Sequence, residues 1–103
     1  MPNIFEIIDK TGRKIRLTQK QWKHIQKHPH MHNSLERIKE TIKNYTSIKY
    51  DEFNEKVNYF YKEYKDISPR ERYLFVSVIY LNENGFIITS FYTNKMTGSK
   101  WKT

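Results

Sequence analysis

The chain of 103 residues contains no cysteine, so it has no disulfide bonds, thiolate metal ligands or thiol nucleophile. Hydrophobic residues make up only 37% of it, and no run approaches the roughly 20 apolar residues that a transmembrane helix needs. The N-terminal stretch also lacks a basic region followed by an apolar run, which a signal peptide would have. We therefore expect a soluble, cytoplasmic protein that does not engage a membrane.

Glycine and proline are scarce as well, with three residues of each, and no repeat, low-complexity tract or linker divides the chain. Aromatic residues are abundant, with eight Tyr and six Phe, and each can bury much surface. A length of 103 residues is typical of one compact domain. We therefore expect a single domain over residues 1–103.

Positive charge is concentrated in the first half. The formal net charge is +8, and residues 1–50 hold 11 of the 19 Lys and Arg but 4 of the 11 Asp and Glu. Such asymmetry is typical of a basic face that binds a polyanion, with nucleic acid the first candidate. A basic surface that serves only solubility is the equal alternative.

The first half predicts a hairpin and a helix. The segments IFEII and KIRL flank a turn that contains Gly12. Thr18 is a good N-cap, and Gln21 three residues later can complete a capping box. The predicted helix runs from about Thr18 to His28, where Pro29 disfavours its continuation.

A second helix is predicted to begin at Asn33 and to end between residues 44 and 47. The rest of the chain is typical of strands, at residues 47–50, 57–65, 72–81 and 86–93. Residues 82–85 form a turn in which the Asn84-Gly85 pair favours a tight hairpin. The fold class is therefore α+β: an N-terminal hairpin or strands, two helices, then a four-stranded antiparallel sheet with the helices on one face.

All four histidines fall within nine residues, at His24, His28, His30 and His32. His24 and His28 are four residues apart, which places both rings on one helix face at zinc-ligand spacing. However, Lys23 and Lys27 add positive charge there, and no nearby residue offers a third ligand. We therefore expect no metal and no cofactor.

Acid–base chemistry suits the histidines better, because imidazole titrates near neutral pH. His28 is held at a helix end immediately before Pro29. A second interpretation is equally weighted: His28 only interacts with the helix dipole. His24 is either its partner or a surface residue, and His30 and His32 are expected to be solvated.

The strands offer two further polar candidates. Strand alternation puts Lys62 on one face with Phe60 and Tyr64, in an aromatic segment where its charge must reach water or an anion. Thr89 interrupts the apolar strand 86–93, although a hydroxyl there can equally serve a cross-strand contact. The tyrosines can stack on bases, but packing is the commoner role of such residues.

The chain contains, in this order, RLTQKQWKHIQKHPHM, YFYKEY, YLFVSV and GFIITSFYTNK, with Trp101 near its end. Together these segments, from about position 15 to 102, resemble the phage-associated branch of the barnase–EndoU–colicin–RelE (BECR) nuclease superfamily. The resemblance implies two helices before a four-stranded antiparallel sheet. It places the catalytic groups at His28, Lys62 and Thr89. We further assign to substrate binding His24, Tyr61, Tyr64, Tyr92 and Lys95.

The resemblance also implies a metal-independent endoribonuclease that acts through an RNA 2′-hydroxyl. Such proteins are often toxins or effectors, tRNA is a frequent target, and an antitoxin or immunity protein is the implied partner. The chain departs from the family pattern at His30, where an acidic residue is common, at Tyr80, where a basic one is common, and in NYTSI, which lacks a helix-closing proline. A non-catalytic domain that binds RNA or DNA is the rival hypothesis.

Overall fold

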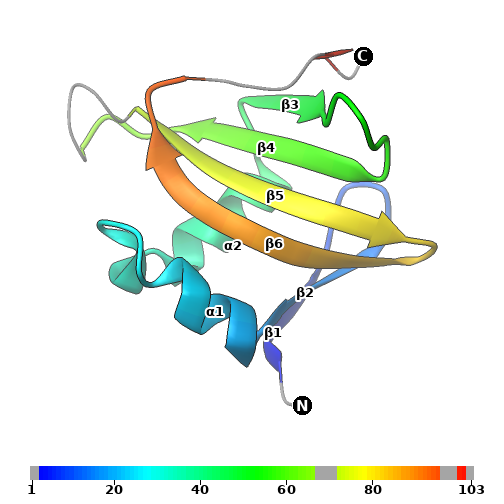
Figure 1. The fold of residues 1–103 in the computed structure, drawn as a ribbon, viewed down its shortest axis with the longest axis horizontal. Helices are drawn as coiled ribbons and strands as arrows, with labels where there is room; N and C mark the ends of the chain where they lie inside the picture. The colour runs from blue at the N-terminus through cyan, green and yellow to red at the C-terminus, as the bar shows by residue number, and fades with distance from the viewer. Residues whose placement is uncertain (1–2, 67–71, 96–99, 102–103) are drawn as a thin grey trace.

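The protein consists of one β-sheet with the helices α1 and α2 packed against it (Figure 1). The computed structural model describes residues 3–66, 72–95 and 100–101, the last two by their backbone alone. The elements, in chain order, are β1 (Asn3–Ile8), β2 (Lys14–Thr18), α1 (Gln19–Ile25), the 3-10 helix η1 (Met31–Asn33), α2 (Leu35–Lys43), β3 (Ser47–Tyr50), β4 (Val57–Glu63), β5 (Tyr73–Leu81), β6 (Asn84–Thr93) and β7 (Lys100–Trp101).

The sheet is mixed, which corrects the predicted four-stranded antiparallel sheet. Its order is β1-β2-β6-β5-β4-β3-β7, and β2 runs parallel to β6 while every other neighbouring pair is antiparallel. Strands β3 to β6 lie where the sequence indicates, but the N-terminal hairpin extends the same sheet. The fold class was wrong here because a strand's periodicity reports which face is buried and not which strand lies beside it.

The core lies between the sheet and the helices. Its buried members come from both hairpin strands, both helices and the three central strands, and include Ile15, Leu17, Ile25, Ile38, Ile42, Leu74 and Val76. Strand β5 is buried on both faces, as predicted for a central strand. On the face away from α2, Phe75 contacts the rings of Tyr61 and Phe91, with centroids 5.3 and 4.7 Å apart.

Helix α1 begins as predicted and ends earlier. The Thr18 hydroxyl accepts a hydrogen bond from the Gln21 N–H at 3.2 Å. Beyond Ile25 the backbone tightens, because the N–H groups of Lys27 and His28 donate to carbonyls three residues back. His28 therefore lies in the turn after the helix and not on its last turn.

The turn between β5 and β6 is set two residues earlier than predicted. Leu81 pairs with Asn84, which leaves Asn82 and Glu83 as a two-residue loop, and Asn82 takes the left-handed conformation at φ 61°. Gly85 lies within β6. A Cβ at that position would stand 3.0 Å from Ile15 Cγ1 and 3.1 Å from Val78 Cγ1, so a side chain there would be tightly packed where β2 meets β6.

Replacing Gly85 with alanine should therefore lower the free energy of unfolding by about 1–3 kcal/mol, because the added methyl group overpacks the contact between β2, β5 and β6. Urea unfolding followed by circular dichroism measures the change. Glu83→Ala in the exposed turn is the matched control and should be near neutral. Equal stability of the two variants would contradict the packing role of Gly85.

A buried carboxylate organises the β1–β2 turn. One oxygen of Asp9 accepts hydrogen bonds from the N–H groups of Thr11 and Arg13 at 2.9 and 3.0 Å, and the other accepts the Tyr80 hydroxyl at 2.8 Å. Burial alone would raise the pKa of Asp9, but a hydrogen bond from the Thr11 hydroxyl and those from Tyr80 and the two N–H groups together lower it below its ordinary value of 3.8. The hairpin is thus tied to β5 by a carboxylate that must be ionised.

Because the folded-state pKa of Asp9 is lowered, its stabilisation is complete above the unfolded pKa near 4 and is lost as pH falls through the folded value. Tyr80→Phe should cost about 1–3 kcal/mol at pH 7, since it leaves the carboxylate short of a donor. Urea unfolding of both proteins at pH 7 and pH 3 measures this. The difference between them should shrink at pH 3, and a constant difference would contradict the role of the ionised carboxylate.

Candidate functional site

A cleft of about 1010 Å³ lies between α1 and β6. Strand β2 pairs with β6 only along Asn84–Phe86, so the second half of β6 has α1 beside it in place of a strand (Figure 1). We call this space the α1–β6 cleft. It is lined by Gln19, Lys20, Gln21, Lys23, His24, Lys27, His28, Ile88, Thr89 and Phe91.

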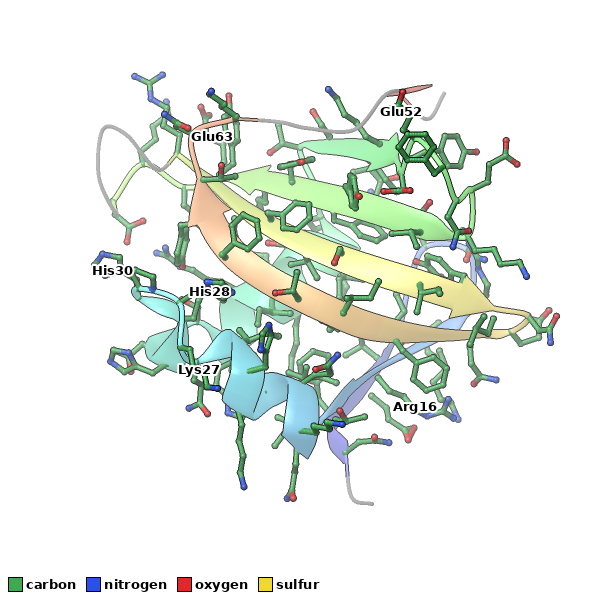
Figure 2. All side chains as sticks on the ribbon, in the orientation of Figure 1. Arg16, Lys27, His28, His30, Glu52 and Glu63 are labelled. Carbon is green, nitrogen blue, oxygen red and sulfur yellow. The ribbon has the colours of Figure 1, made fainter. Side chains whose placement is uncertain are left out.

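Two imidazoles meet at one end of the cleft. The ring centroids of His24 and His28 are 5.9 Å apart in an edge-on contact, and the His28 ring packs on Phe91 at 5.3 Å. His24 is exposed, whereas His28 is half-buried. The His28 N–H donates to the Ile25 carbonyl at 3.0 Å, and its own carbonyl accepts from the Met31 N–H at 3.3 Å. The backbone and the aromatic contact together hold the His28 imidazole beside β6 (Figure 2).

Thr89 reaches the cleft because β6 is irregular at this point. Thr89 lies opposite Ser77 and Ile87 opposite Val78, so one residue of β6, Ile88, has no counterpart on β5. Such a bulge re-aims the side chains around it. It brings Ile88 and Thr89 into the same cleft lining as His28.

The cleft is positively charged. Lys20, Lys23 and Lys27 follow one another at spacings of three and four residues, which places them along one face of α1 and the turn after it. No carboxylate is present among the described residues that line the cleft. A space bordered by three cations and two imidazoles attracts anions.

The structure does not bring Lys62 to this cleft. The register aligns Lys62 with Leu74 and Tyr92 on the face that packs against α2, whereas Thr89 lies on the opposite face. The Lys62 ammonium donates to the Asn44 carbonyl at 3.1 Å. His28 and Thr89 thus share one lining, and Lys62 is separated from them by the thickness of the sheet.

Of the five residues assigned to substrate binding, the structure places His24 alone in this cleft. Tyr61 is fully buried against Phe75, and Lys95 lies exposed beyond β6. The Tyr64 hydroxyl donates to Glu40. The pKa of Tyr64 is raised, mainly by burial and then by this hydrogen bond. The Tyr92 hydroxyl lies on the α2 face, 2.7 Å from the Ser34 hydroxyl.

His30 and His32 are exposed, as predicted, but they border a second space. This smaller recess, of about 260 Å³, is lined by His30, His32, Asn33, Ser34, Arg37, Asp66 and Tyr92. We call it the Arg37 recess.

Sequence reasoning missed the cleft's cations. From the sequence, Lys23 and Lys27 are interpreted only as charges that disfavour a metal site, and Lys20 is assigned no role. Their three- and four-residue spacing along α1, interleaved with His24 and His28, is the signal that points to one anionic ligand for both sets.

Among residues 3–66, 72–95 and 100–101, no group of three His, Asp or Glu could hold a metal ion. Within the same residues, no helix is long and apolar enough to cross a membrane. No family model, curated protein or solved structure matches this chain. The site must therefore be interpreted from its own residues.

Thr18 sets the start of the helix that carries His24. Replacing it with alanine removes the hydrogen bond to the Gln21 N–H and should lower the free energy of unfolding by about 1 kcal/mol. Thr18→Ser keeps the accepting hydroxyl and should retain most of the stability. Thermal unfolding of the three proteins tests this, and equal loss in both variants would contradict the capping role.

Proposed function

We propose that the protein is a metal-independent endoribonuclease that cleaves RNA in the α1–β6 cleft. The observation that supports this most is the pair His24 and His28 in a cleft lined by three lysines. Phosphodiester transfer needs proton-transfer groups and positive charge together, and this cleft holds both. The sequence resemblance to the phage-associated BECR nucleases supports the same reaction.

In the proposed reaction, a base removes the proton from an RNA 2′-hydroxyl, and the 2′-oxygen forms a bond to the adjacent phosphorus. The bond from phosphorus to the 5′-oxygen breaks, and an acid protonates the leaving oxygen. The products are a 2′,3′-cyclic phosphate and a 5′-hydroxyl end. We assign one proton transfer to His28, which is held in place, and the other to His24, whose exposed ring can turn toward a bound phosphate.

In this proposal the cleft lysines, and not Lys62, stabilise the negative charge that develops on the phosphate. The cleft is lined by Lys20, Lys23 and Lys27, which would border a phosphate bound there. Lys62 instead faces α2. The Thr89 hydroxyl, in the same lining, would contact the phosphate or the 2′-hydroxyl. On the strength of the sequence resemblance, we further propose that the substrate is tRNA and that the partner is an antitoxin or immunity protein. The protein would then act in the cytoplasm as a toxin or phage-related effector.

Replacing His28 with alanine should lower the rate of RNA cleavage by at least about 100-fold, because a proton-transfer group is lost. The assay incubates purified protein with total tRNA in excess EDTA and identifies the fragment ends. Gln26→Ala is the control: it truncates an exposed side chain at the end of α1 that lines neither the cleft nor the Arg37 recess. Full activity of the His28 variant would remove His28 from the site.

A nucleic-acid-binding domain without catalysis is the second candidate, and the three cleft lysines favour it equally. It predicts RNA that is bound but uncut in the same assay, with binding unaffected by His28→Ala. The analysis of fragment ends distinguishes the two functions.

Both functions require the cleft lysines to hold phosphates. The double variant Lys23→Gln/Lys27→Gln should bind RNA more weakly, and the slope of log K against log salt should fall by roughly 0.7 for each phosphate that the protein no longer neutralises. The control Lys43→Gln/Lys56→Gln makes the same charge change at exposed positions outside the cleft. Equal slopes for the two double variants would place the RNA elsewhere.

A further inference from the structure

The Arg37 recess and the α1–β6 cleft lie on the two sides of one turn. The His28 ring contacts Phe91 at 5.3 Å, and the His30 ring contacts the next residue of β6, Tyr92, at 6.4 Å. Neighbouring residues of a strand point to opposite faces of the sheet, so the turn presents one imidazole to each space. Figure 2 shows His28 and His30 in this turn, near the end of β6. The two spaces are therefore neighbours across this turn.

A buried network fixes the wall of the recess. The Ser34 side chain is buried, with 3% of the residue exposed, and its hydroxyl donates to the His30 carbonyl at 2.8 Å. The Tyr92 hydroxyl, 2.7 Å away, then donates to the Ser34 oxygen, and it accepts from an Arg37 Nη1 at 3.5 Å. The network holds His30 in its left-handed conformation, at φ 67°, and links the backbone of the turn to the guanidinium.

The guanidinium of Arg37 is positioned to bind an anion. Its guanidinium lies over the Tyr64 ring, with Cζ 4.2 Å from the centroid, and Nη2 donates to the Asp66 carboxylate at 2.6 Å. The hydrogen bond from Arg37 lowers the pKa of Asp66, so this group is a carboxylate at neutral pH. A planar guanidinium binds carboxylate and phosphate through the same donors.

Asp66 is the one carboxylate among the described residues that line the recess, and its side chain is 61% exposed against 30% for Arg37. An exposed carboxylate of this kind adds little stability to a fold. Its exposure also leaves it open to replacement by a competing anion. The carboxylate therefore stands where a phosphate would sit.

We propose that the Arg37 recess binds a second phosphate of the RNA strand, one that flanks the scissile phosphate in the α1–β6 cleft. Arg37 is the main donor, His30 and His32 border the phosphate, and Asp66 occupies the guanidinium until RNA displaces it. This inference rests on the proposed function for the identity of the ligand, since the phosphate belongs to the substrate.

Binding of an oligoribonucleotide whose 2′-hydroxyls are replaced by hydrogen tests the recess without cleavage. Arg37→Gln should weaken binding about tenfold or more and reduce the salt slope by roughly 0.7, as expected when one phosphate is no longer neutralised. Lys39→Gln is the matched control, because Lys39 lies on the same helix, pairs with Glu36 and does not line the recess. Equal affinity and slope for the two variants would overturn the proposal.

Asp66→Asn gives the opposite expectation. It removes the competing carboxylate and should tighten binding of the same oligonucleotide several-fold, a gain that misfolding cannot produce. Unchanged or weaker binding would show that Asp66 does not compete with the ligand, which would overturn that part of the proposal.

A second measurement separates the recess from the nuclease reaction. Inorganic phosphate added to the wild-type protein should shift the imidazole NMR signals of His30 and His32, and Arg37→Gln should abolish the shift. If wild-type protein does not cut RNA but shows this shift, the recess stands and the nuclease function falls. If His28-dependent cleavage occurs while Arg37→Gln and Asp66→Asn bind the oligonucleotide as wild type does, the recess falls and the nuclease function stands.

Discussion

The structure depends on β6 having two different neighbours along one edge, first β2 and then α1. Its first residues pair with β2, and because Gly85 has no side chain, the side chains of Ile15 and Val78 pack directly against its backbone. Among the described residues no strand pairs with the second half of β6 on that side, and α1 packs there. The chain passes directly from β2 into α1, and the Thr18 cap marks where the helix begins. This change from strand to helix along one edge of β6 forms the cleft and brings the lysines and histidines of α1 and the following turn to it.

The turn after α1 then converts one sequence cluster into two environments. His28 is held by its backbone hydrogen bonds and by Phe91, and it faces the cleft. His30 adopts a left-handed backbone conformation and faces the recess beside Tyr92. The two residues are chemically alike and two positions apart. Their surroundings differ because adjacent residues of β6 project from opposite faces of the sheet.

Electrostatics separates the two spaces further. The cleft has lysines and no carboxylate among its described lining residues, so its field is open to an incoming polyanion. The recess has its guanidinium already engaged by Asp66. In the proposed function, successive phosphates of one nucleic acid strand would occupy the two spaces.

Local patterns in the sequence determined the strands of the meander, the cap at Thr18 and the gathering of basic and imidazole side chains, because each depends on neighbours within a few residues. The resemblance implied His28, Lys62 and Thr89 as members of a site, and the structure places His28 and Thr89 in one cleft. Only the tertiary structure decided that β2 lies parallel to β6, that Lys62 faces α2 and that Tyr92 meets Ser34. These are pairings between segments far apart in the chain, and periodicity along one strand carries no information about its neighbour or about which face the helices cover.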